Sequence, residues 1–269
     1  SFLHLVAIAR FLLNMNKSFP QQYSIGIDYG TNSVRTIVAD CRDGHIAGSS
    51  VFEYSHGENG VISNENPNLS RQHPSDYIEG LKKTVRNAIS DADINPELIV
   101  GIGIDATAST PIPLSQNGNA LAFDSYFNNE LSAYAWLWKD HTSFKEAEEI
   151  TNHARELRPE YLNACGGVYS SEWFWSKILN CLRNNPETFN AADSWMELQD
   201  WIPFLLTGNR TLGLCAAGHK GLYSDTWGGL PDDEFLNTID NRLLKVKRKL
   251  PKKAQNIGHI AGKLNLKWA

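Results

Sequence analysis

Several patterns that would assign a function at once are missing from this sequence. The eight histidines form no HExxH or other metal-ligand pattern, and the four cysteines form no CxxC pair: Cys41, Cys165, Cys181 and Cys215. A GxxxxGK loop followed by Ser or Thr is absent, as are HRD and DFG motifs, which argues against P-loop kinases and protein kinases. We expect reduced thiols, as in a cytosolic protein.

The sequence also lacks a membrane-spanning run and an excess of positive charge. The apolar residues 2–13 are too few to cross a bilayer, Arg10 interrupts them, and no positive charge precedes them as in a secretory signal. The net charge is −5, and the basic run at 245–253 has no interleaved aromatic residues, which favours a solvated face or linker. We therefore expect a cytoplasmic protein with neither nucleic acid nor a membrane as partner.

What is present is the composition of a globular domain. Apolar residues make up 42% and charged residues 20% of 269 residues, enough for a core without disulfide or metal support. The first methionine is Met15, and a polar stretch follows it. We expect residues 1–14 to be a non-native or disordered extension and residues 15–269 to form one domain.

Apolar runs and turns predict the order β-β-β-α-β in the first 105 residues. Strands are expected at 23–28 and 34–40, and a third one should end at about Glu53. A helix should start near His73-Pro74-Ser75-Asp76. The run 98–104 is almost continuously apolar, as in a central strand covered on both faces, and it ends at Asp105. This order, with acids at the tips of the first and fourth strands, is typical of an α/β, ribonuclease H-like (actin-like ATPase) domain with a mixed sheet flanked by helices.

Further helices are expected at 143–157, 171–183 and 200–206. For the last one, Asp200 is the expected N-cap and Gly208 the residue just past its end.

The turn between the first two strands carries the most chemistry. Its glycine lets backbone N–H groups approach a phosphate, and hydroxyls can add hydrogen bonds. An aspartate at the strand tip can hold Mg²⁺ through water, and Arg35 could offset charge on a transferring phosphoryl group. The residues are Asp28, Gly30, Thr31, Asn32, Ser33 and Arg35. An ordinary β-turn uses the same residue types and is the alternative.

Six stretches in order resemble the FGGY carbohydrate kinase family, in particular its ketopentose kinases. They are GIDYGTNSVRTIVAD (26–40), GIGIDATAST (101–110), LWKDHT (137–142), GGVYSSEWFWSKIL (166–179), ELQDWIPFLLTG (197–208) and CAAGHKGLYSDTWGGLP (215–231). The resemblance covers residue 23 to the end of the chain.

This resemblance implies ATP and Mg²⁺ as cofactors and a role for individual residues. The six residues of the first turn would face the ATP phosphates, with Asp28 toward the metal. Ala108 and Lys220 would contact the sugar, and Asp140 in the W-x-D segment would point toward the cleft. The general-base aspartate would fall beyond residue 269, so no residue here is assigned as the catalytic base, and the chain alone should be inactive.

The implied reaction is transfer of the ATP γ-phosphate to a ketopentose, with L-ribulose and arabinose breakdown as the expected substrate and pathway. Each residue also has a plainer interpretation: Lys220 as a surface lysine, Trp173 and Trp175 as core, and Asp140 as half of a salt bridge. Another pentulose or a pentitol is an alternative substrate. A non-kinase actin- or Hsp70-like protein or a purely structural chain is an alternative class, and a homodimer stays open for a full-length protein.

Overall fold

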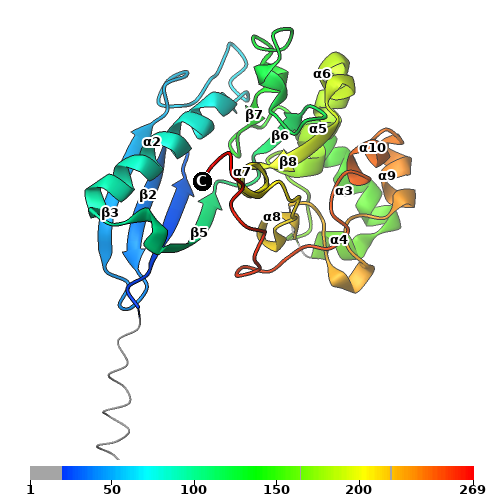
Figure 1. The fold of residues 1–269 in the computed structure, drawn as a ribbon. Helices are drawn as coiled ribbons and strands as arrows, with labels where there is room; N and C mark the ends of the chain where they lie inside the picture. Colours follow the sequence, from blue (N-terminus) through cyan, green and yellow to red (C-terminus); the bar gives the residue numbers. More distant parts are fainter. Residues whose placement is uncertain (1–19, 164, 219) are drawn as a thin grey trace, which may run out of the picture.

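A four-stranded mixed sheet and a helical lobe make up the chain in the computed structural model, which describes residues 20–163, 165–218 and 220–269 (Figure 1). The strands of the sheet are β1 (Tyr23–Tyr29), β2 (Ser33–Asp40), β3 (Ile46–Glu53) and β5 (Ile99–Ala106), in the spatial order β3-β2-β1-β5. β1 pairs antiparallel with β2 and parallel with β5. The predicted β-β-β-α-β order and the α/β, actin-like fold class are confirmed. The prediction for residues 1–14 lies outside the described residues.

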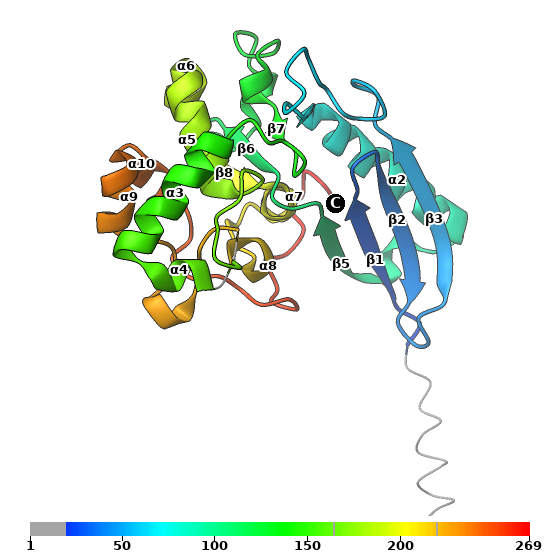
Figure 2. The same ribbon diagram turned by 180° about the vertical axis from the view of Figure 1, so that it is seen from behind.

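Helix α2 (Pro74–Ala92) packs on one face of this sheet, against β2 and β3. It starts where the sequence predicts, with His73 as the N-cap accepting from the Ser75 N–H. Alternate residues of β1 and β2 point toward the helix, and Ile25, Ile27, Val34 and Val38 are buried there. Figure 2 shows the opposite face of the sheet. Ile37 in β2 and Val51 in β3 are exposed.

The expectation that strand 98–104 is central and covered twice is wrong. Among the described residues, β5 is an edge strand, and Val100 and Ile102 are 57% and 38% exposed. The physical reason is that α2 packs mainly on β2 and β3, so that much of β5 is left uncovered.

The second lobe is built from short elements around a second hydrophobic core that includes Trp136, Trp175 and Trp195 (Figure 1). Its α-helices are α3 (Phe144–Leu157), α4 (Pro159–Asn163), α5 (Phe174–Asn184), α6 (Pro186–Ala191), α7 (Leu198–Thr207), α8 (Leu214–Ala217), α9 (Asp233–Asp240) and α10 (Leu243–Lys247). Two-stranded sheets join β4 (Arg71–Gln72) to β7 (Ala135–Trp136) and β6 (Pro111–Leu114) to β8 (Ser194–Glu197). The 3₁₀ turns are η1 (Pro96–Leu98), η2 (Leu121–Phe123), η3 (Leu131–Ala133) and η4 (Asp225–Trp227).

The three further helices that the sequence predicts are confirmed as α3, α5 and α7, and Gly208 ends α7 in the left-handed conformation. The prediction that Asp200 is the N-cap is wrong, since Glu197 holds that position. Asp200 is instead buried in the first turn, where its Oδ1 accepts the Gly213 N–H at 2.9 Å. None of the helices in the described ranges has the length and hydropathy that crossing a bilayer requires.

Close packing of α2 on β3 gives a first prediction, about Gly48. A Cβ atom there would lie 2.4 Å from the Ala88 carbonyl oxygen and 2.5 Å from the Ala92 nitrogen, both backbone atoms of α2. Gly48→Ala should therefore push the helix off the sheet and lower the free energy of unfolding by about 1–3 kcal/mol. Gly101→Ala in β5 is the matched control, because its Cβ would meet nothing within 4 Å. Urea unfolding would contradict the packing argument if both variants unfold at the same midpoint.

The burial of Asp200 gives a second prediction, about pH. Burial raises the pKa of Asp200 to about 7, and nearby Glu197 adds to the shift, while the Gly213 N–H opposes it. The folded chain then keeps a proton that the unfolded chain releases near pH 4, so the free energy of unfolding falls as pH rises from about 4 to about 7. Asp200→Asn keeps an acceptor for Gly213 and does not titrate, so this fall should shrink. Urea midpoints measured between about pH 4.5 and about pH 8 test it; parallel curves for the two proteins would be the contrary result.

Candidate functional site

The turn between β1 and β2, which we call the phosphate hairpin (residues 28–35), lies at the tip of the sheet. The Gly30 N–H donates to the Ser33 carbonyl at 2.9 Å and closes the turn. Asp28 and Arg35 face each other across the two strands, and both side chains are accessible, at 52% and 64% exposure. Their Oδ2 and Nη1 atoms are 3.8 Å apart. The hairpin therefore presents one carboxylate and one guanidinium side by side to solvent.

Neighbouring segments hold this hairpin in place. The Gln72 Nε2 donates to the Thr31 carbonyl at 2.7 Å, and the Trp138 indole N–H donates to the Thr31 hydroxyl at 3.0 Å. Asn32 donates to the Asn59 carbonyl at 2.6 Å. These contacts come from three separate segments, so the conformation of the turn depends on tertiary structure as well as on its own sequence.

The parallel pairing of β1 with β5 places Asp28 beside Asp105. Both carboxylates are exposed at the carboxyl ends of adjacent strands. The sequence places acids at both strand tips, although a metal was expected only at Asp28. Two neighbouring carboxylates supply the oxygen atoms that Mg²⁺ prefers, directly or through its water molecules.

The residues after β5, which we call the sugar segment (Thr107–Thr110), continue directly beside the hairpin. The Thr107 N–H donates to the Tyr29 carbonyl at 3.0 Å. Glu197 binds the other end of the segment, accepting from the Ser109 hydroxyl and from the Thr110 N–H. Burial raises the pKa of Glu197, whereas the Ser109 hydroxyl and the nearby charge of Lys177 oppose that rise.

Lys220 contacts this segment although it lies 112 residues after Ala108 in the sequence. Its Nζ donates to the Ala108 carbonyl at 2.8 Å, which brings together the two residues that the sequence assigns to the sugar. The turn that carries Lys220 is held by the GGVYSSEWFW stretch: the Tyr169 hydroxyl donates to the Lys220 carbonyl, and the Trp175 indole N–H donates to the Gly221 carbonyl at 2.8 Å. Trp175 is buried, so it supports the site from the core.

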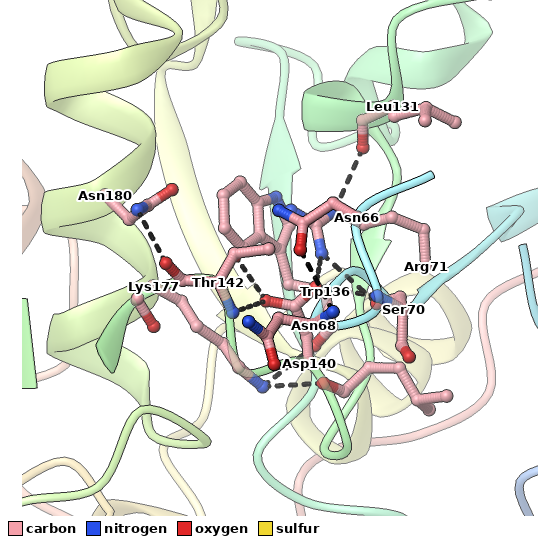
Figure 3. Close-up of polar contacts among 12 residues, drawn as sticks. Asn66, Asn68, Ser70, Arg71, Leu131, Trp136, Asp140, Thr142, Lys177 and Asn180 are labelled. Atoms are coloured by element: carbon pink, nitrogen blue, oxygen red, sulfur yellow. Dashed lines mark hydrogen bonds and ion pairs between the residues drawn. The ribbon is translucent and has the colours of Figure 1, made fainter. Parts of the chain in front are cut away.

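The resemblance implies that Asp140 points toward the cleft, but the structure places its side chain in the protein interior. It is fully buried, and it accepts from the Arg71 guanidinium, the Ser70 N–H and the Thr142 hydroxyl (Figure 3). The geometry supports the salt-bridge interpretation over a contact with substrate. In the same W-x-D stretch, it is Trp138 that touches the hairpin.

Sequence reasoning missed Trp138, Gln72, Glu197 and the buried lysine Lys177. Of these, Lys177 carried a detectable signal: it lies three residues after Phe174 and four before Cys181, on the apolar stripe of α5. A charged residue on such a stripe is unusual unless it has a specific partner.

Comparisons with known proteins identify the family. The N-terminal domain profile of the FGGY family of carbohydrate kinases matches residues 23–227. A ribulokinase from Vibrio parahaemolyticus is 35% identical over 256 residues, which cover 93% of this chain and 45% of the relative. A ribulokinase from Shouchella clausii is 36% identical over 234 residues, 84% of this chain and 41% of the relative. The chain thus spans less than half the length of these curated relatives.

Solved structures share the fold at low identity. A xylulose kinase from Rhodospirillum rubrum superposes with a TM-score of 0.70 at 17% identity, over 92% of this chain and 45% of that one. A glycerol kinase from Plasmodium falciparum with ADP superposes with a TM-score of 0.64 at 18% identity, over 86% of this chain and 42% of that one. From the profile match and the curated relatives, the chain belongs to the FGGY family of carbohydrate kinases and corresponds to its N-terminal domain.

Proposed function

We propose that this chain supplies the sugar-binding and phosphate-binding side of an ATP-dependent kinase that converts L-ribulose to L-ribulose 5-phosphate, as in arabinose breakdown. The observation that carries the proposal is one connected site. Lys220 binds the sugar segment at Ala108, and the same segment binds the phosphate hairpin through Thr107. The ribulokinase names of the relatives support L-ribulose as the sugar.

The phosphate side of the proposal rests on the residues around Asp28. This carboxylate and that of Asp105 are accessible and adjacent, which fits a magnesium ion held largely through water. Mg²⁺, when bound with ATP, neutralises charge on the phosphates. Arg35 is exposed on the same face and would stabilise the transferring phosphoryl group, while the backbone N–H groups and hydroxyls of residues 30–33 would orient the phosphate chain.

The sugar side rests on Lys220 and Ala108. An ammonium carries three donors, and within the described contacts the Ala108 carbonyl takes one of them, which leaves donors for sugar hydroxyls. Ala108 carries only a methyl group as its side chain. Both residues would bind and orient the sugar so that one hydroxyl meets the γ-phosphate in line.

Lys220→Met tests the sugar assignment. Loss of a charged donor to the sugar should raise the Kd for L-ribulose by roughly tenfold to a hundredfold, as expected for a hydrogen bond worth about 1.5–3 kcal/mol. Lys83→Met is the control, since Lys83 pairs with Glu79 on α2, on the helical side of the sheet. Calorimetric titration with L-ribulose, D-ribulose, D-xylulose and ribitol would also identify the sugar. Equal affinity for L-ribulose in Lys220→Met and the unmodified chain would refute the assignment of Lys220. Tighter binding of another sugar would indicate that this other sugar is the substrate.

The family resemblance assigns proton removal from the sugar hydroxyl to an aspartate beyond residue 269. Glu197 is buried and already accepts two hydrogen bonds, and Asp140 is paired with Arg71, so neither carboxylate is available as a base.

We therefore expect the 269-residue chain to bind sugar without turning it over. A coupled ADP-release assay with L-ribulose and Mg²⁺·ATP should show no sugar-dependent rate above the no-enzyme blank, with a ribulokinase of known activity as the positive control. Sugar-dependent turnover close to that of the control enzyme would mean that a base lies within this chain.

A further inference from the structure

Lys177 is a lysine whose ammonium lies inside the protein core. It belongs to α5, and its exposed fraction is 0%. Its Nζ donates to three backbone carbonyls: Ser109 at 2.9 Å, Trp136 at 3.2 Å and Leu137 at 2.7 Å. Figure 3 shows the Lys177 side chain extending from its helix toward Trp136 and the Arg71–Asp140 pair. The three donors of the ammonium thus match three acceptors.

These carbonyls belong to two segments that lead to opposite ends of the site. Ser109 follows Ala108, whose own carbonyl accepts from Lys220. Leu137 precedes Trp138, whose indole N–H donates to the Thr31 hydroxyl of the phosphate hairpin. A single side chain therefore holds the sugar segment against the strand that supports the hairpin.

The charge of Lys177 has no direct carboxylate partner within the described contacts. The nearest acids have other donors: Asp140 accepts from Arg71, and Glu197 accepts from Ser109 and Thr110. Burial lowers the pKa of Lys177 to about 7; Asp140, Glu197 and Glu172 oppose this shift, and Arg71 adds to it. Such burial costs free energy, and an apolar side chain of similar volume is often as stable or more stable. Stability alone therefore does not account for a lysine here, whereas the fixed geometry of three carbonyls does.

We propose that Lys177 is a positioning residue of the sugar site, which fixes the Ala108 peptide relative to the Thr31 hydroxyl by binding the Ser109, Trp136 and Leu137 carbonyls together. This inference rests on the proposed function, because it concerns the same sugar and the same phosphate hairpin. Lys177 touches neither ligand in this assignment and acts only through the two backbone segments.

Calorimetric titration of the 269-residue chain with L-ribulose tests the inference. Lys177→Met fills a similar volume without donors, so the Kd should rise about tenfold or more, and the ratio of affinities for L-ribulose over D-ribulose should shrink. Lys177→Gln keeps an NH₂ donor on a side chain that is one bond shorter, so its Kd should lie between those of the unmodified chain and Lys177→Met. It also serves as the second variant if Lys177→Met does not fold.

Leu179→Ala separates positioning from stability. Leu179 is a fully buried residue of the same helix, and its truncation should cost about 2–5 kcal/mol of unfolding free energy while leaving the Kd for L-ribulose within about twofold.

The inference alone is overturned if Lys177→Met or Lys177→Gln binds L-ribulose as tightly and as selectively as the unmodified chain, or if Leu179→Ala weakens binding as much as they do. If the unmodified chain binds none of the pentuloses, the proposed function fails first, and the inference fails with it.

Discussion

The parallel pairing of β1 with β5 is the interaction on which the site depends. It sets Asp28 level with Asp105, and it carries the chain out of β5 beside the phosphate hairpin, where Thr107 bonds to Tyr29. A shift of one residue in this register would turn one of the two carboxylates to the α2 side of the sheet, because side chains alternate along a strand. The placement of Asp28 beside Asp105 and that of Thr107 beside Tyr29 thus follow from a single backbone register.

Buried charge surrounds the sugar segment, and its arrangement is cooperative. Glu197 and Lys177 bind the Ser109 side chain and backbone, respectively, while Lys220 takes the preceding carbonyl. Each charged group is costly to bury alone, but together they bind four polar groups of a short irregular segment: the Ala108 and Ser109 carbonyls, the Ser109 hydroxyl and the Thr110 N–H. Side chains have to supply these hydrogen bonds, since the segment belongs to neither a helix nor a sheet. The same contacts that make the burial tolerable also make the segment rigid.

Particular elements show which parts of the fold and of the site could be predicted from the sequence. The strands β1 to β3 and helix α2 were predictable because their signals are local: short apolar runs separated by turn residues, and a proline in the first helical turn. The exposure of β5 was not, since an apolar run does not reveal which neighbours cover it. The contacts of Lys177 were also out of reach, because its three carbonyl partners lie about 40 and 68 residues away in the chain. The assignment of Ala108 and Lys220 to the sugar came from resemblance. The structure joins the two residues by a hydrogen bond, and their role with sugar stays a prediction.

The W-x-D stretch shows why a motif can be significant while its charged member is not the ligand. Asp140 accepts from Ser70, Arg71 and Thr142, and these contacts fix the turn that follows β7. Because that turn is fixed, the residue two positions earlier, Trp138, reaches the Thr31 hydroxyl. The Arg71 guanidinium also lies 3.5 Å above the centre of the Trp136 ring, so the ion pair and the strand form one packed unit. The aspartate thus acts on the hairpin through the tryptophan, and a buried ion pair is suited to this task, since its value lies in fixing geometry more than in adding stability.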